Sequence, residues 1–163
     1  MGSLINSVSL TTDATLTGDG SAVSSQSRLR LLSFNIQTGI ATSRYRHYVT
    51  RSLRHVLPHP ERLDNLDRIA GLLGNYDIVG LQEVDGGSLR SGFINQTEYL
   101  AMQAGFPHWH AQTNRNLGKF AQHSIGVVSQ LRPSLVKELR LPGMIPGRGA
   151  MMLRYGRGEH ALN

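Results

Sequence analysis

The sequence predicts a mixed α/β fold, and three observations support this prediction. Two short apolar runs, over residues 29–34 and 77–84, have the length and composition of buried strands. Between them, residues 61–73 carry leucine, isoleucine and alanine at helical spacing. After residue 107, further strand-like runs follow at short intervals, so strands crowd the C-terminal half. With 163 residues, 39% of them hydrophobic and 17% charged, the chain is long enough for one globular core.

Composition excludes several classes of protein. The chain has no cysteine, which excludes a disulfide framework, a thiolate metal cluster and a thiol nucleophile. Its apolar runs are far shorter than the roughly 20 residues that cross a bilayer, so a transmembrane protein is not expected. Residues 1–27 contain eleven Ser or Thr, which predicts a flexible tail ahead of a domain over residues 28–163. This tail has neither the pattern of a secretory signal nor an Arg-rich presequence, so a cytoplasmic protein is expected.

The first predicted strand begins near Arg28 and ends at the polar residue Asn35. A basic loop with interleaved tyrosines follows it and contains Arg44 and Arg46. Arginine forks and tyrosine rings suit phosphates and bases, while a solvated loop that keeps the protein soluble explains the same residues equally well. Pro60 or Glu61 is expected to open the helix that follows, and Gly74-Asn75 is expected to end it.

The second predicted strand, residues 77–84, also gathers polar residues at its end. Strand, helix and strand within about 55 residues have the size of a βαβ unit. Asn95, with Glu98 three residues later, has the pattern of a capping pair and predicts a second helix ending at Gly105. The later strands are expected over residues 108–113, 124–130, 135–141 and 150–155.

The net charge of +6 is unevenly distributed along the chain. Residues 28–60 carry six arginines and no acid, residues 61–98 carry seven acids against three arginines, and residues 99–163 carry eight cations against two acids. Fifteen of the seventeen cations are arginine, whose planar fork suits phosphate and carboxylate. An acidic centre between two basic segments fits a metal-bridged phosphate site, although chance and genomic composition bias produce similar patterns. A strongly basic chain also favours polyanionic partners such as nucleic acid or anionic lipid.

Glu83 and Asn35 are the candidate site residues that the pattern itself indicates. A carboxylate at the C-terminal edge of a strand is rigidly held and half solvated, which suits a hard divalent cation. An amide at such an edge can donate to a phosphate oxygen or accept from a metal-bound water. If the two strands lie side by side, both side chains emerge at one sheet edge, the expected place for a site in an α/β fold. The ordinary alternatives are a surface acid for Glu83 and a turn former for Asn35.

Other titratable or nucleophilic residues carry weaker signals. His108 and His110 alternate along a predicted strand, but no third ligand accompanies them, which favours a polar strand face over a metal site. His123 precedes a predicted strand and is interpreted as a surface or interface residue. Ser124 and Ser129 lack a Ser-His-acid arrangement, and the sequence has no Walker-type or Gly-x-Gly-x-x-Gly motif.

Two segments separated by the predicted helix resemble the start of the endonuclease/exonuclease/phosphatase superfamily: Leu31-Leu32-Ser33-Phe34-Asn35 and Asp77-Ile78-Val79-Gly80-Leu81-Gln82-Glu83-Val84. This group includes pancreatic-type deoxyribonuclease, abasic-site endonucleases, inositol polyphosphate 5-phosphatases and neutral sphingomyelinases. Residues 124–130 resemble the family's Gly-x-Ala-hydrophobic-hydrophobic-Ser-Arg strand, with departures at Ser124, Gly126 and Gln130. Arg148 resembles the arginine that begins the following strand, so the resemblance covers residues 28–160.

The resemblance implies the N-terminal half of a four-layer α/β/β/α sandwich and a Mg²⁺-dependent phosphoester hydrolase, with Mn²⁺ as an alternative cation. It implies Glu83 as the carboxylate ligand of the cation and Asn35 as its neighbour in the metal and phosphate shell. Arg148, Arg44 and Arg46 are expected to support or contact the substrate phosphate. The family's Asn-x-His, Asp-x-Asn and terminal Ser-Asp-His motifs are not present, and no Asp follows Asp85. DNA, phosphoinositide and phospholipid hydrolases share these N-terminal elements, so the substrate stays open.

Two functions from different classes follow from these observations. The first is a metal-dependent hydrolase of phosphoester bonds, of phosphodiesterase or nuclease type. Because the general base of the family is missing, its activity in this chain is expected to fall by at least about a hundredfold. The second is a non-catalytic basic fragment that binds nucleic acid or a partner protein.

Overall fold

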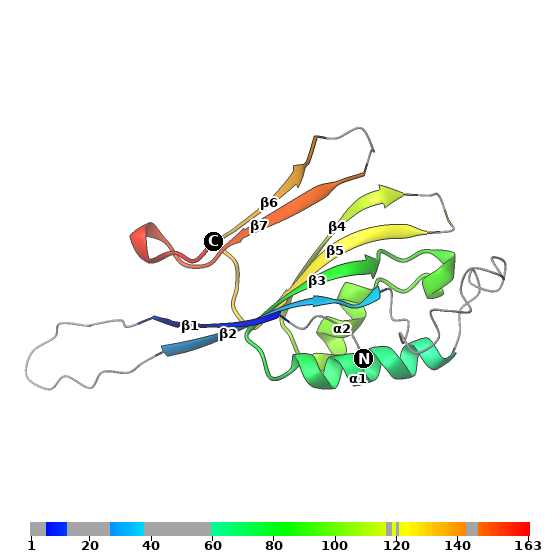
Figure 1. Cartoon of the computed structure of the whole chain (residues 1–163), viewed down its shortest axis with the longest axis horizontal. Helices are drawn as coiled ribbons and strands as arrows, with labels where there is room; N and C mark the ends of the chain where they lie inside the picture. Colours follow the sequence, from blue (N-terminus) through cyan, green and yellow to red (C-terminus); the bar gives the residue numbers. More distant parts are fainter. Residues whose placement is uncertain (1–5, 13–26, 38–59, 117–118, 120, 143–146) are drawn as a thin grey trace, which may run out of the picture.

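The computed structural model describes residues 6–12, 27–37, 60–116, 119, 121–142 and 147–163, and these residues form a mixed α/β fold (Figure 1). The larger sheet has five strands in the order β1-β2-β3-β5-β4, and the smaller sheet pairs β6 with β7. Helices α1 (Pro60–Leu73) and α2 (Gln96–Ala104) lie on one face of the larger sheet, and the smaller sheet lies on the other face (Figure 1). The strands are β1 (Asn6–Thr12), β2 (Ser27–Asn35), β3 (Ile78–Asp85), β4 (His108–Asn116), β5 (Gln122–Ser129), β6 (Leu135–Arg140) and β7 (Gly149–Arg154).

The βαβ unit predicted from the sequence is confirmed. Strands β2 and β3 are direct neighbours and run parallel, with α1 as the connection between them. Helix α1 begins at Pro60 and ends at Leu73, immediately before Gly74. Helix α2 is capped as expected, because the Asn95 side chain accepts hydrogen bonds from the backbone N–H groups of Thr97 and Glu98. All other neighbouring strands in both sheets are antiparallel.

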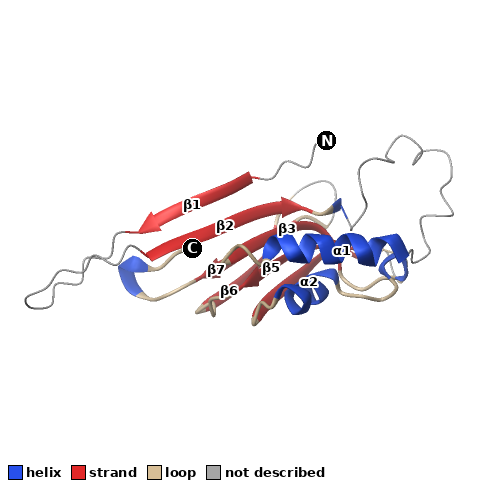
Figure 2. Cartoon of the chain, turned by 90° about the horizontal axis from the view of Figure 1, so that it is seen from below, coloured by secondary structure: helices blue, strands red, loops and turns tan. Residues whose placement is uncertain are grey.

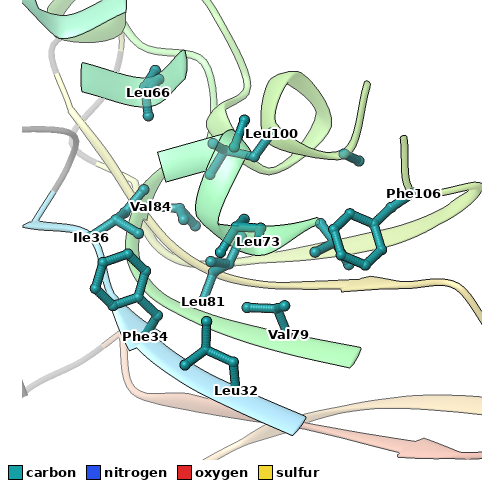
Figure 3. Close-up of a cluster of buried hydrophobic side chains, with 13 residues drawn as sticks. Leu32, Phe34, Ile36, Leu66, Leu73, Val79, Leu81, Val84, Leu100 and Phe106 are labelled. Carbon is teal, nitrogen blue, oxygen red and sulfur yellow. The ribbon is translucent and has the colours of Figure 1, made fainter. Parts of the chain in front are cut away.

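The main core lies between the larger sheet and the two helices, which Figure 2 shows side by side in front of the strands. Apolar residues of β2 and β3 meet the inner faces of α1 and α2 there (Figure 3). Because side chains alternate along a strand, Leu32, Phe34 and Ile36 share this face. The buried residues of the whole main core are Leu32, Phe34, Ile36, Leu66, Ala70, Leu73, Val79, Leu81, Val84, Leu100, Ala101, Phe106 and Val128.

A second apolar cluster joins the two sheets. Ile78 of β3 packs with Leu153 of β7 and with the adjoining Tyr155, and Leu29 and Leu31 of β2 lie against them. Strand β2 therefore packs on both faces, with Leu32 and Phe34 on the helix side and Leu29 and Leu31 on the side of the smaller sheet.

The structure bears on three of the sequence-based predictions about the fold. Residues 6–12, inside the segment expected to be a flexible tail, form strand β1 in antiparallel register with β2. Arg44 and Arg46 lie outside the described residues. Of the four layers implied by the resemblance, the described residues form helices, a sheet and a second sheet, but no outer helix layer over β6 and β7.

Among the described residues, no helix is both long and apolar enough to span a membrane.

Candidate functional site

Asn35 and Glu83 lie at the same edge of the larger sheet, as the sequence predicted. In the parallel register of β2 and β3, Asn35 pairs with Gln82, so Glu83 is the next residue beyond that pair. The backbone N–H of Ile36 donates to the carbonyl oxygen of Gln82 at 3.1 Å, which continues the pairing past the end of β2. The two candidate residues therefore come from adjacent strands at the carboxyl edge of the parallel pair, where sites of α/β folds form.

A β-bulge sets the position of Glu83. Leu81 pairs with Gly126 and Val84 pairs with Ser124, so residues 82 and 83 of β3 face only Ile125 of β5. The extra residue lets both Leu81 and Val84 point into the helix-side core, while Glu83 stays exposed. Glu83 has a φ of 54°, in the left-handed region that residues with a side chain rarely adopt. Bulges of this kind often occur beside active sites, where they redirect a side chain.

Backbone strain gathers at this end of the molecule. Among the described residues, the three non-glycine residues with positive φ are Gln37, Glu83 and Phe93, with φ values of 48°, 54° and 63°. They follow β2, interrupt β3 and lie in the loop after β3, respectively. The Oδ1 atom of Asn35 accepts a hydrogen bond from the backbone N–H of Gln37 at 2.9 Å, which closes the turn beyond β2. Such strain is frequent at functional sites and supports placing a site at this edge.

Gln82, the other member of the Gln-Glu pair, joins the two strands. Its Nε2 atom donates to the hydroxyl of Ser33 at 2.7 Å, across from β3 to β2. Ser33 lies two residues before Asn35, and Gln82 lies directly before Glu83. The bond therefore fixes the spacing of the two strands just before the candidate residues. Gln82 is therefore assigned a structural contact in this fold.

Asp85, at the end of β3, holds the loop that follows it. Its side chain is fully buried. The Oδ1 atom accepts from the backbone N–H groups of Gly87 at 2.9 Å and Ser88 at 2.7 Å, and from the Ser91 hydroxyl at 3.0 Å. The Oδ2 atom accepts from the Ser88 hydroxyl at 2.7 Å. The buried carboxylate thus organises the loop 86–95 that follows the candidate site.

A second bulge places Arg148 at the same end of the molecule. Thr113 pairs with Ser124 and Arg115 with His123, so Asn114 is an extra residue in β4. A Cβ at position 149 would lie 2.9 Å from the Asn114 side-chain Cγ, and one at position 147 would lie 2.8 Å from the Asn114 carbonyl oxygen. Only glycine fits at both positions, and the two glycines bring Arg148 against the end of β4. Strand β4 is the second strand from β3 in the larger sheet, so β5 lies between the candidate residues and the strand end that Arg148 adjoins.

Next to the bulge of β3 lies a cluster of polar side chains that the sequence did not predict: Thr113, Gln122 and Ser124. A Cβ at Gly86 would lie 2.8 Å from the Gln122 Oε1 and Ser124 Oγ atoms and 3.1 Å from Thr113 Oγ1. The Thr113 and Ser124 hydroxyls are hydrogen-bonded to each other at 3.1 Å. Asn114 was missed as well, and its Oδ1 atom is buried without a hydrogen-bond partner among the described residues. Only the close backbone approach at Gly86 and Gly149 reveals these contacts, and a single sequence carries no sign of it.

His108 and His110 lie away from Asn35 and Glu83. Strand β4 begins with His108 and His110, at the opposite end of the sheet from the bulges. Among the described residues, no group of three His, Cys, Asp or Glu side chains is close enough to hold a metal ion. Exposed cations near the candidate edge are Arg115, Lys119 and Arg148. Any cation bound at Glu83 would therefore rely on water and substrate for most of its ligands.

Comparison with known proteins connects this geometry to a fold. No family model and no curated protein matches the chain. Among solved structures, it matches an endonuclease/exonuclease/phosphatase family protein from Leptotrichia buccalis C-1013-b, with a TM-score of 0.52 and 12% sequence identity. The match covers 82% of this chain and 52% of that protein, so the chain spans about half the length of the structure that it resembles. Over the matched part, the chain therefore shares the fold of this structure.

Proposed function

We propose that the chain is a metal-dependent hydrolase of phosphoester bonds, of phosphodiesterase or nuclease type, with Glu83 as the carboxylate ligand of a divalent cation. The observation that carries this proposal is the juxtaposition of Asn35 and Glu83 on adjacent parallel strands, with Glu83 held exposed at a bulge with a φ of 54°. A strained backbone that keeps a carboxylate exposed at the carboxyl edge of a sheet is common at functional sites. The distant likeness of the fold to a superfamily of phosphoesterases adds support.

The donors at this edge fit Mg²⁺, or Mn²⁺ as the alternative. Mg²⁺ prefers oxygen ligands, keeps several waters and is commonly held by one or two carboxylates together with substrate phosphates. Glu83 supplies an exposed carboxylate, and Asn35 ends the adjacent parallel strand. When bound, the cation would polarise a phosphate oxygen and stabilise the charge that develops during hydrolysis.

The chain's own residues have separate tasks in this proposal. The Oδ1 atom of Asn35 already accepts from Gln37 N–H, so the Nδ2 group is the part of the amide suited to donate to a phosphate oxygen. Arg148, which adjoins the end of β4, would neutralise part of the phosphate charge. Arg44 and Arg46, which lie outside the described residues, retain the same proposed role in substrate binding.

A basic binding module without catalysis is the second candidate function. The net charge of +6 favours it. So does the finding that, among the described residues, no three His, Cys, Asp or Glu side chains are grouped closely enough to hold a metal ion. Such a module would bind nucleic acid, or a partner protein, through its arginines. Its affinity for DNA would fall steeply with salt because bound phosphates release counterions.

Hydrolysis of bis-p-nitrophenyl phosphate and of plasmid DNA, with Mg²⁺, with Mn²⁺ and with a chelator, tests the proposal. Glu83→Gln is expected to lower any cation-dependent activity by at least about a hundredfold. Glu138→Gln, which changes an exposed glutamate of β6 in the same way, is the matched control and is expected to retain activity. Activity that survives Glu83→Gln would overturn the metal assignment. Salt-sensitive DNA binding without any turnover would favour the binding module.

A further inference from the structure

We propose that Phe93 is a stacking platform for an unpaired nucleobase beside the candidate site. This inference rests on the proposed function, because the base belongs to the phosphoester that the site would bind. The side chain of Phe93 is 62% exposed, and the residue has a φ of 63°. A phenylalanine in this conformation loses both burial and backbone freedom, whereas glycine would adopt the same φ without cost. Core packing therefore gives no reason for an aromatic residue at this position.

The loop that carries Phe93 is firmly held. The buried Asp85 carboxylate binds residues 87, 88 and 91, and the Phe93 N–H donates to the Ser88 carbonyl oxygen at 2.8 Å. A β-bridge between Gly86 and Asn95 closes the base of the loop, and Asn95 caps α2 immediately afterwards. The ring therefore projects from a preorganised backbone, which lowers the entropy lost when a ligand binds.

The position of the loop connects it to a phosphoester. It begins at Gly86, three residues after Glu83, at the end of the molecule where β2 and β3 finish (Figure 1). The Leu89 N–H donates to the Lys119 carbonyl oxygen at 2.7 Å, so an exposed lysine lies against this loop. An aromatic face next to cations and a phosphate site is the arrangement that binds single-stranded nucleic acid, since every base offers a flat π surface.

The surroundings of Phe93 favour a base over a lipid surface. Among the loop side chains that the structure describes, Leu89 and Ile94 are partly buried and the others are glycines, serines and Asn95, so Phe93 is the exposed apolar ring of this group. Insertion into a membrane needs a broad apolar face together with cations, which one ring does not supply. Stacking of one base, in contrast, requires only one ring.

The test compares binding of fluorescein-labelled octathymidylate with binding of an abasic oligonucleotide of equal length and charge, by fluorescence anisotropy with Ca²⁺ in place of Mg²⁺. Wild type is expected to prefer the thymidine oligonucleotide by about tenfold, the size of one stacked base. Phe93→Gly and Phe93→Asn, which both tolerate positive φ, are expected to abolish the preference without lowering the melting temperature. Phe93→Tyr is expected to retain the preference, and Met102→Ala, an exposed apolar side chain of α2, to leave it unchanged.

The outcomes separate this inference from the proposed function. A base preference that depends on Phe93 and persists in Glu83→Gln supports the stacking platform, even where no hydrolysis is found. Glu83-dependent hydrolysis together with equal affinity for both oligonucleotides overturns the stacking platform and leaves the proposed function standing. Absence of measurable oligonucleotide binding, or Phe93-dependent binding to phosphatidylserine vesicles in its place, also overturns the inference.

Discussion

Gly126 of β5 faces Thr97 of α2 so closely that no side chain fits between them. A Cβ at position 126 would lie 2.7 Å from Thr97 Cγ2 and would also overlap Thr97 Oγ1. Thr97 is fully buried and β-branched, so it has little freedom to move away. The family pattern that residues 124–130 resemble has alanine at this position, and here the threonine of the helix occupies the space of that methyl group.

Gly126→Ala is therefore expected to destabilise the fold by about 1–3 kcal/mol through overpacking. The added substitution Thr97→Ala is expected to recover part of this loss, because it removes both overlapping atoms. Chemical denaturation of the two single variants and the double variant measures the coupling. Gly71→Ala is the control, since nothing lies within 4 Å of a Cβ there and a helical alanine stabilises by about 0.5–1 kcal/mol. Additive effects at 97 and 126 would show that the contact does not limit packing.

The parts of the fold that the sequence predicted are those whose signals are local. Helix α1 follows from its apolar spacing between Pro60 and Gly74, and β2 and β3 follow from short apolar runs that end in polar residues. Strand β1 could not be predicted, because its Ser- and Thr-rich sequence becomes a strand through pairing with β2 and not through its own composition.

The candidate site was predicted in part for the same reason. Asn35 and Glu83 are brought together by parallel pairing, which the strand–helix–strand order indicates. The bulges at Glu83 and Asn114 depend on how β5 pairs with both of its neighbours, which only the assembled sheet determines. The buried role of Asp85 depends on a loop whose N–H groups converge on it, and this convergence leaves no pattern in the sequence.

The positive φ of Glu83 predicts a difference between two variants that both remove its carboxylate. Glu83→Gly is expected to be more stable than Glu83→Ala by about 1 kcal/mol, because glycine adopts a φ of 54° without steric cost. Thermal and urea unfolding of the two proteins measure this difference. If Glu83→Ala proved the more stable, the backbone at the bulge would not be strained. Both variants are expected to lose cation-dependent hydrolysis to the same extent, since neither retains a ligand.

Asp85 predicts a structural loss and not a catalytic one. Asp85→Asn replaces one acceptor oxygen by a donor that faces N–H and hydroxyl groups, so we expect a loss of about 2–4 kcal/mol in the free energy of unfolding. Hydrogen exchange is expected to accelerate first in residues 86–95, which the carboxylate holds. Asp64→Asn, an exposed substitution in α1, is the control and is expected to change stability by less than about 0.5 kcal/mol. Unchanged exchange in the loop of Asp85→Asn would contradict the assignment.

Tyr99 and Asp67 predict a pH dependence at the contact between α2 and α1. The Tyr99 hydroxyl donates to Asp67 Oδ1 at 2.6 Å. This hydrogen bond, together with partial burial and the negative charges of Asp67 and Asp64, raises the pKa of Tyr99 from 10.0 to about 12. Asp67→Asn is expected to return the pKa toward 10.0, as followed by ultraviolet absorbance of tyrosinate in a difference titration against Tyr99→Phe. An unchanged titration in Asp67→Asn would show that the aspartate does not control this phenol.

The same pKa shift sets the direction in which stability changes with pH. Between pH 10 and 12 the unfolded chain loses the Tyr99 proton while the folded chain retains it, so the contribution of Tyr99 is complete below pH 10 and is lost as pH rises through about 12. Burial also raises the pKa of Tyr155, which adds to the decline in the same direction. The test is therefore the difference between wild type and Tyr99→Phe, whose stability is expected to fall less steeply over this range. Because the hydrogen bond between Tyr99 and Asp67 is exposed, solvent screening keeps this difference below about 1 kcal/mol.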